Sequence, residues 1–308
     1  RIESRGLGDV YKRQLLKTFD FKDMNPETSS TIPIVLPEKI NRLVDFMKSM
    51  QHCVVAYSGG VDSAVVAKIA ALVLGERAKA VMAVSPSVAT GEVESAKTLA
   101  EEIGIDFHLI HTSEMEDPRY LKNDERRCYY CKQGLYLALK EFVREFPHTT
   151  IANGTNTDDL GDYRPGLEAA RELRVVSPLV EAGLNKQNVR QLAKQWNLSV
   201  WDKPATPCLS SRIAYGESVT PERLRMVDQA ETYLRSLGFR ELRVRYHAGD
   251  LARIEIPQGE VSRFATIAED KKIANRFRDL GFRFVTLDLV GFRSGSLNSL
   301  VQITKSPS

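Results

Sequence analysis

Hydrophobic residues along the chain follow two different spacings. Apolar runs typical of buried strands recur at 53–57, 80–84, 105–111 and 149–153, and patterns of helical spacing lie between them at 61–74, 91–103 and about 125–146. An amphipathic helical pattern over 36–50 precedes the first run. Strands that alternate with helices are typical of parallel βαβ units. We therefore predict an α/β fold with a doubly wound, mostly parallel sheet that is covered by helices on both faces.

The pattern changes after about residue 216. It predicts a helix over 221–237, two alternating strands at 242–246 and 251–256, helical segments up to 280 and a last strand over 282–290. This order is typical of a second, smaller α+β domain. The predicted boundaries are a first domain over 34–206, a second over 207–292 and a tail over 293–308.

The first fourteen residues are set apart from the rest. Residues 9–14, Asp-Val-Tyr-Lys-Arg-Gln, resemble the translation of a sequencing-library adaptor, and no Met precedes them. We interpret residues 1–14 as a non-native leader that has no part in the fold. An ordinary disordered basic tail is the alternative.

The composition is that of a globular protein with little net charge. Of the 308 residues, 27% are charged and 43% hydrophobic, and the formal net charge is +3. So small a charge argues against nucleic acid as a partner, and any anion site must be local. The chain contains no apolar run of membrane-spanning length and no secretion signal. We therefore expect a cytoplasmic protein without membrane association.

A glycine turn joins the first predicted strand directly to a helix. It reads Ser58-Gly59-Gly60-Val61-Asp62-Ser63. Glycines let backbone N–H groups approach phosphate oxygens, and the helix start adds partial positive charge. Ser58 and Ser63 can donate to phosphate, while Asp62 can cap the helix or hold Mg²⁺. The turn lacks the Walker lysine and resembles the PP-loop family, which cleaves ATP between its α and β phosphates. A glycine-rich turn without catalytic meaning is the alternative.

A second polar turn follows the strand predicted at 149–153. It reads Asn153-Gly154-Thr155-Asn156-Thr157-Asp158-Asp159. Because ligands of parallel sheets lie beyond the carboxyl ends of the strands, Asn153 and Asp158 are candidates to hold Mg²⁺ or the nucleotide. A plain helix cap is an equally good interpretation of Asp158.

Three cysteines are candidates for metal or sulfur chemistry. Cys128 and Cys131 have CxxC spacing beside Arg126, Arg127 and Lys132, and Cys208 follows much later. Basic neighbours lower the pKa of a thiol, so we expect all three to be reactive. Three thiolates can hold a 4Fe-4S cluster with one iron open to an extra sulfide, whereas structural zinc normally needs a fourth protein ligand. Cys53 opens a buried strand and is interpreted as a core residue.

Four motifs together resemble the LarE family over about residues 36–290. They are the phosphate loop, Arg-Cys-Tyr-Tyr-Cys-Lys, Gly-Thr-Asn-x-Asp-Asp-x-x-Asp-Tyr-Arg-Pro-Gly and Pro-Cys-Leu-Ser-Ser-Arg-Ile-x-Tyr-Gly. That family makes the nickel-pincer nucleotide cofactor of lactate racemase: it adenylates a pyridinium dicarboxylate mononucleotide and converts its carboxylates to thiocarboxylates. The resemblance also implies a homo-oligomer. It leaves the sulfur source open.

The resemblance implies two alternative sulfur donors. In some members the cysteine matching Cys208 gives up its own sulfur and becomes dehydroalanine, so that each molecule acts once. In others three cysteines carry a cluster and the sulfur comes from outside. The three-cysteine pattern favours the cluster. The alternative is that only Cys208 works and the CxxC pair is incidental.

Further site residues are predicted around Cys208 and in the second domain. Arg212 is close enough in sequence to Cys208 to stabilise an oxyanion or lower the thiol pKa. Arg243 and Arg245 alternate along a predicted strand, so they share a face and can clamp one phosphate or carboxylate. The resemblance implies that they bind the phosphate of the substrate. A solvated basic face is the alternative. Glu231 is similar to a family carboxylate near the reacting centre.

Other classes of function share part of this pattern. A tRNA thiolase uses the same ATP chemistry and a similar cluster, but the small net charge argues against it. An amidotransferase-type synthetase has the loop but no need of the cysteines. A nucleotide-sensing module would bind ATP without cleaving it.

Overall fold

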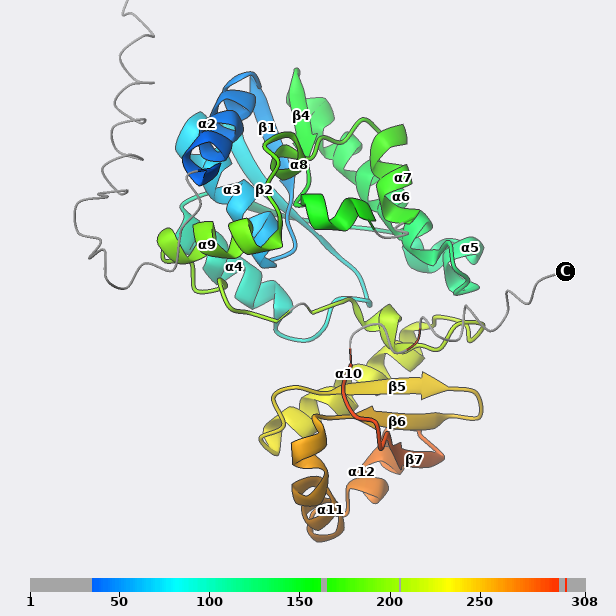
Figure 1. Cartoon of the computed structure of the whole chain (residues 1–308). Coiled ribbons are helices and arrows are strands. Elements are labelled where there is room, and N and C mark those ends of the chain that lie inside the picture. Colours follow the sequence, from blue (N-terminus) through cyan, green and yellow to red (C-terminus); the bar gives the residue numbers. More distant parts are fainter. Residues whose placement is uncertain (1–34, 162–164, 205, 294–296, 298–308) are drawn as a thin grey trace, which may run out of the picture.

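The computed structural model describes residues 35–161, 165–204, 206–293 and 297, and these residues form two domains, each with its own sheet (Figure 1). The predicted leader over 1–14 lies outside the described residues. No helix within the described ranges combines the length and apolarity needed to cross a membrane.

The sheet of the first domain has four parallel strands. They are β1 (His52–Ala56), β2 (Ala78–Val84), β3 (Asp106–His111) and β4 (Thr149–Ala152), in the order β3-β2-β1-β4. Because the chain moves to one side of β1 for β2 and β3 and to the other side for β4, the order reverses at β1. In open α/β sheets the ligand site lies at such a point, beyond the carboxyl ends of the strands.

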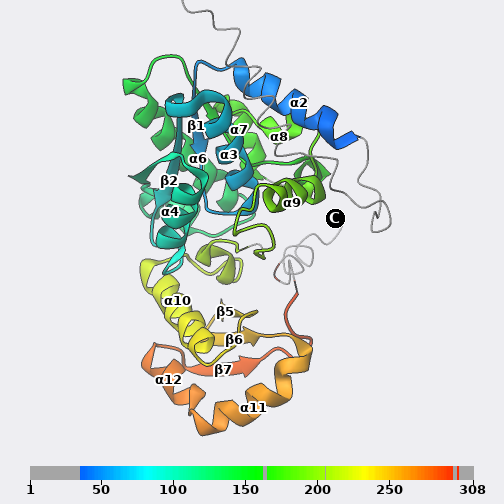
Figure 2. The ribbon, with the colours of Figure 1, turned by 90° about the vertical axis from the view of Figure 1, so that its left-hand side faces the viewer.

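Helices cover both faces of this sheet, as Figure 2 shows from the side. Within β1, Val55 packs into the cluster on one face and Val54 into the cluster on the other. The first face carries α2 (Val35–Lys48), α3 (Val61–Leu74), α4 (Glu92–Ile103), α8 (Pro178–Glu181) and α9 (Lys186–Gln195), and the second carries α6 (Arg127–Phe142) and α7 (Pro165–Glu172). The predicted doubly wound parallel fold is confirmed.

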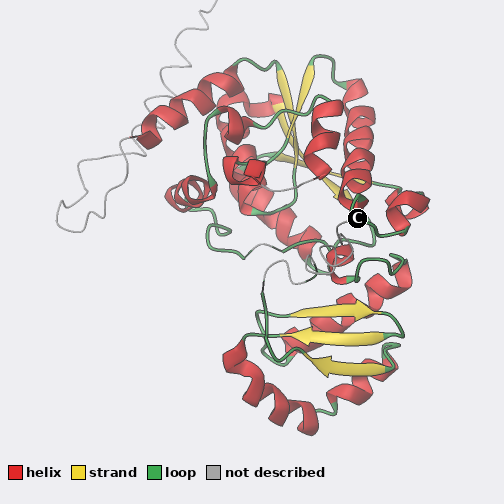
Figure 3. Ribbon diagram, turned by 45° about the vertical axis from the view of Figure 1, so that its right-hand side comes forward, coloured by secondary structure: helices red, strands yellow, loops and turns green. Residues whose placement is uncertain are grey.

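The second domain packs helices on one mixed sheet (Figure 3). Its strands β5 (Arg243–His247), β6 (Leu251–Glu255) and β7 (Phe284–Leu287) are in the order β5-β6-β7, with an antiparallel and a parallel pair. Its helices are α10 (Pro221–Ser236), α11 (Val261–Asp270) and α12 (Ile273–Asp279). Tyr246, Phe277 and Phe282 fill a core of its own. The predicted smaller α+β domain is confirmed.

The two domains meet along α5 (Pro118–Leu121) and the start of α6. Tyr120 of α5 is a first-domain residue, yet its side chain packs in the core of the second domain. At the end of the second domain, Phe292 N donates to the carbonyl of Ile256, and Leu297 further on is buried. Leu297 is therefore a buried residue within the predicted tail.

Candidate active site

The phosphate loop is a tight turn at the carboxyl end of β1. Gly59 has a φ of +70°, and a Cβ there would lie 3.0 Å from the Cβ of Ala96 in α4. Gly60 caps α3 without a side-chain bond, so N–H groups of the first helical turn remain available to an anion. The glycines are thus needed for backbone shape as well as for access.

The two loop serines are bonded to the loop itself. The hydroxyl oxygens of Ser58 and Ser63 are 3.2 Å apart, and Ser63 Oγ donates to the carbonyl of Gly60 at 3.0 Å. Both hydroxyls are therefore held at the turn, and a phosphate oxygen can replace these exchangeable bonds. The structure brings Ser58, Gly59, Gly60 and Ser63 together as predicted.

Asp62 is held by two side chains from distant parts of the chain. Lys186 Nζ lies 2.5 Å from Asp62 Oδ2, and Asn156 Nδ2 donates to Asp62 Oδ1 at 3.2 Å. Sequence reasoning missed Lys186, which is 124 residues from Asp62. One signal was present, because Asn185 begins a capping box with Asn188 and so marks Lys186 as the first residue of a helix.

The second polar turn packs directly on the phosphate loop. A Cβ on Gly154 would lie 2.7 Å from the backbone nitrogen of Ser63, so only glycine allows this approach. The predicted residues Asn153 and Asp158 are bonded to segments that flank the phosphate loop and not to the loop itself. Asn153 Oδ1 accepts from Ser177 Oγ at 2.9 Å, and Asp158 Oδ2 accepts from the backbone nitrogen of Lys186 at 3.1 Å.

The CxxC pair opens α6. Cys128 is exposed and Cys131, one turn later, is half-buried. Burial raises the pKa of Cys131 to about 12, helped by the charge of Cys208 and outweighing the opposite effect of Lys132. The expectation that basic neighbours make all three thiols reactive is therefore wrong for Cys131. Cys53 is confirmed as a core residue, 1% exposed.

Cys208 reaches the same edge of the first sheet as the phosphate loop. It is exposed and precedes the short 3-10 helix Leu209–Arg212. The backbone nitrogen of Leu209 donates to the carbonyl of Ser87, which follows the carboxyl end of β2. The three cysteines interact electrostatically, since Cys208 and Cys128 both contribute to the raised pKa of Cys131. Within the described residues, no set of three His, Cys, Asp or Glu side chains is arranged to hold a single metal ion.

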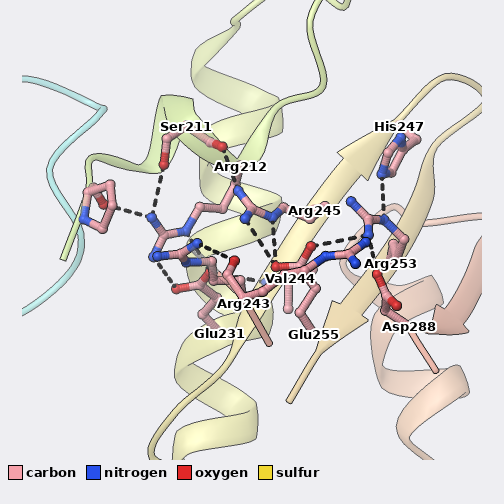
Figure 4. Close-up of polar contacts among 12 residues, drawn as sticks. Ser211, Arg212, Glu231, Arg243, Val244, Arg245, His247, Arg253, Glu255 and Asp288 are labelled. Carbon is pink, nitrogen blue, oxygen red and sulfur yellow. Dashed lines mark hydrogen bonds and ion pairs between the residues drawn. The ribbon is translucent and has the colours of Figure 1, made fainter. Parts of the chain in front are cut away.

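Arg212 and Glu231 form a buried ion pair (Figure 4), and Arg212 ends the segment 207–212, which we call the Cys208 loop. Arg212 Nε lies 2.9 Å from Glu231 Oε1, and its NH1 donates to the carbonyl of Pro207 at 2.7 Å. Glu231 also accepts from Arg235 and from the backbone nitrogen of Val244. Glu231 is fully buried, so it holds Arg212 in place and does not face solvent.

Arg243 and Arg245 point to one face of β5, as the alternation predicts, but their surroundings differ. Arg245 Nε donates to Glu255 at 3.1 Å and its NH1 to the carbonyl of Ser211 at 2.8 Å. Arg243 has no carboxylate within ion-pair distance in the described part of the chain. Its guanidinium lies 4.6 Å from the ring centre of Phe292 and donates to the carbonyl of Arg293.

Burial lowers the pKa of both arginines, Glu255 acts in the opposite direction, and neighbouring arginines lower the pKa further. Arg243 and Arg245 are 6% and 3% exposed, so the alternative of a solvated basic face is wrong. Arg243 is a buried cation without a carboxylate at ion-pair distance in the described residues, and an anion that binds beside it offsets part of the cost of its burial.

The sheet with its two glycine-bearing turns defines an enzyme of the PP-loop class that uses ATP. The model of the NAD synthase family matches residues 36–124, which include the phosphate loop. A glutamine-hydrolyzing GMP synthase component of Thermococcus kodakarensis is 27% identical over 58% of this chain and 62% of its own.

Two relatives cover almost the whole chain. Pyridinium-3,5-bisthiocarboxylic acid mononucleotide synthase of Lactiplantibacillus plantarum is 39% identical over 85% of this chain and 95% of its own length. An uncharacterized protein of Synechocystis is 44% identical over 87% of this chain and 99% of its own. The chain belongs to the LarE family, and it is an ATP-dependent sulfur-transferring enzyme.

Proposed function

We propose that this enzyme adenylates a carboxylate of a pyridinium dicarboxylate mononucleotide and converts it to a thiocarboxylate, with release of AMP and pyrophosphate. The observation that carries the proposal is the position of Arg243. This buried cation has no carboxylate partner among the described residues and lies in the network beneath the Cys208 loop. An anionic substrate bound there has its reacting end close to a sulfur-bearing loop.

ATP binds at the carboxyl edge of the first sheet in this proposal. Ser58, Gly59, Gly60 and Ser63 surround the phosphates, and Asp62 is the carboxylate best placed to hold Mg²⁺. Asn153 and Asp158 contribute indirectly, because they fix the second polar turn and the start of α9. A free carboxylate is a poor electrophile, and its attack on the α-phosphate gives an acyl-adenylate with a good leaving group.

The mononucleotide is held from the second domain. Its phosphate fits against Arg243, with Arg245 fixed beside it by Glu255. Arg212 stabilises negative charge that develops near Cys208, to whose carbonyl it is bonded. Glu231 acts through Arg212 as a positioning residue, since it is buried and its oxygens are engaged.

The sulfur step is proposed to depend on a 4Fe-4S cluster held by Cys128, Cys131 and Cys208. When bound, such a cluster leaves one iron open to an extra sulfide. The donor set fits a cluster better than a single ion. Cys128 and Cys131 lie one turn apart on α6, Arg127 joins α6 to the segment that carries Cys208, and thiolates are the ligands that iron-sulfur clusters use. The alternative is that Cys208 gives up its own sulfur.

The test is anaerobic turnover with ATP, the dicarboxylate mononucleotide and sulfide, followed by iron analysis and mass spectrometry. The proposal expects AMP, pyrophosphate and a thiocarboxylate product, with about four irons per chain that are lost in Cys128→Ala. A protein without iron whose Cys208 becomes dehydroalanine after turnover establishes the alternative donor. Failure to form AMP with this substrate contradicts the proposed function.

A further inference from the structure

The two arginines before the CxxC pair point in opposite directions. Arg126 turns outward, where it pairs with Glu168 of α7 at 3.3 Å and lies over the ring of Tyr129. Arg127 turns inward to the boundary between the domains and is only 5% exposed. Two residues that look alike in the sequence therefore have different surroundings.

Arg127 joins the first cysteine to the loop of the last one. Its NH1 donates to the carbonyl of Ser210 at 2.7 Å, and Ser210 is two residues after Cys208. The same nitrogen donates to Asn123 Oδ1 at 2.6 Å, while NH2 lies 3.8 Å from the Sγ of Cys128. One side chain thus spans 83 residues of sequence and both domains.

The residues around Arg127 make this contact part of a buried seam. Tyr120 Oη lies 2.5 Å from Ser210 Oγ. Asn123 is fully buried with a φ of +57°, and its amide donates to the carbonyls of Ala214 and Glu217 at 2.8 Å each. The segment that carries Cys208 is therefore fastened to α5 and α6 by side chains that contact water little.

Within the described part of the chain, the charge of Arg127 is not balanced by a carboxylate. Its polar contacts are an amide oxygen, a carbonyl and a thiol, and the ring of Tyr215 lies 5.7 Å away. No Asp or Glu of the described residues pairs with it. Hydrogen bonds alone would be made as well by a neutral side chain, so a buried cation here indicates an anion at the adjacent cysteines.

We infer that Arg127 is a positioning residue for sulfur transfer: it holds the Cys208 loop against the CxxC helix and places one positive charge beside the thiol of Cys128. This inference rests on the proposed function. It applies to either sulfur donor, because both need Cys208 at a fixed place. Adenylation takes place at the phosphate loop and does not need it.

The test compares Arg127→Gln with Arg127→Lys, with Arg126→Gln as the matched control. Lysine keeps the charge, but it has no second nitrogen to contact Cys128 while the first donates to Ser210 and Asn123. The first readout is hydrogen exchange over residues 208–217 in metal-free protein, which we expect to be faster in Arg127→Gln and unchanged in Arg126→Gln. The second readout is ATP–pyrophosphate exchange measured beside thiocarboxylate formation.

For Arg127→Gln we expect thiocarboxylate formation to fall roughly 100-fold, the size expected for a misplaced reacting group, while pyrophosphate exchange changes less than about 2-fold. Arg127→Lys should recover part of the loss. A merely structural role would lower both rates together and would overturn the inference, as would unchanged hydrogen exchange over 208–217. If wild-type protein forms no thiocarboxylate, the proposed function fails. Hydrogen exchange over residues 208–217 then still decides whether Arg127 holds the Cys208 loop.

Discussion

Lys186 and Asp62 meet across the phosphate loop, with Lys186 Nζ 2.5 Å from Asp62 Oδ2. The loop lacks the lysine of a Walker motif, and this ion pair brings a cation to the same place from the start of α9. Binding of Mg²⁺ and ATP can separate the ion pair. The carboxylate of Asp62 then binds the metal, and the ammonium group of Lys186 can contact the leaving pyrophosphate.

Replacing Lys186 by Gln is expected to slow ATP–pyrophosphate exchange by about 100-fold, the usual effect of removing one donor to a developing charge. Lys194→Gln is a suitable control, because Lys194 contacts the ring of Trp201 near the other end of the same helix. Exchange rates measured over a range of Mg²⁺ concentrations give the answer. Equal rates for both variants would show that Lys186 only supports the loop in the absence of ATP.

Gly154→Ala is expected to destabilise the first domain by roughly 1–3 kcal/mol and to weaken ATP binding, because the added methyl group meets the backbone of Ser63. Gly134→Ala is the control. Gly134 lies within α6, and a Cβ added there would have no neighbouring atom within 4 Å. Alanine at this position should therefore stabilise the helix by roughly 0.5–1 kcal/mol. Denaturant unfolding measures both changes, and similar effects would contradict the close packing at Gly154.

Phe292→Ala is expected to raise the KM for the mononucleotide by roughly 2- to 30-fold, which corresponds to losing a cation–π contact of about 0.5–2 kcal/mol with Arg243. The KM for ATP should not change. Phe284→Ala is the matched control, because that ring is exposed on β7. A rise in both KM values would indicate general damage to the fold.

Cys53 gives a pH dependence whose sign is fixed. Burial raises its pKa to about 12, from an ordinary value of about 8.5 in the unfolded chain. Its stabilising contribution is complete below the unfolded value and is lost as the pH rises toward 12. We expect wild-type protein to lose about 2 kcal/mol more than Cys53→Ala between pH 7 and 10. Parallel pH profiles of unfolding free energy for the two proteins would contradict this.

Much of the fold follows from local patterns in the sequence. The helix Val61–Leu74 has the predicted bounds, because the glycine turn and Gly75 limit it on both sides. The last strand was predicted over 282–290 but ends at Leu287, since the chain turns there and Gly291 N donates to the carbonyl of Asp288. Hydrophobicity alone does not show where such a turn interrupts an apolar run.

The site was predictable where its residues lie within one motif. The phosphate loop needed only the spacing of its glycines and serines. Lys186 and Phe292 contact the site from far along the chain: the capping box at Asn185 marks Lys186 only as the start of a helix, and Phe292 has no local signature. The sequence also does not distinguish Arg126 from Arg127, because burial depends on which way a helix start faces its neighbour. The periodicity of hydrophobic residues predicts helices and strands, but it does not predict which distant segments contact each other.

The contact between Phe292 and Arg243 also affects how the protein is made. Phe292 follows every helix and strand of the described fold, so a ribosome releases it after all of them. The arginine site is therefore incomplete while the rest of the second domain is already free to fold. A nascent chain should therefore be able to bind ATP at its first domain before its second domain can bind the mononucleotide.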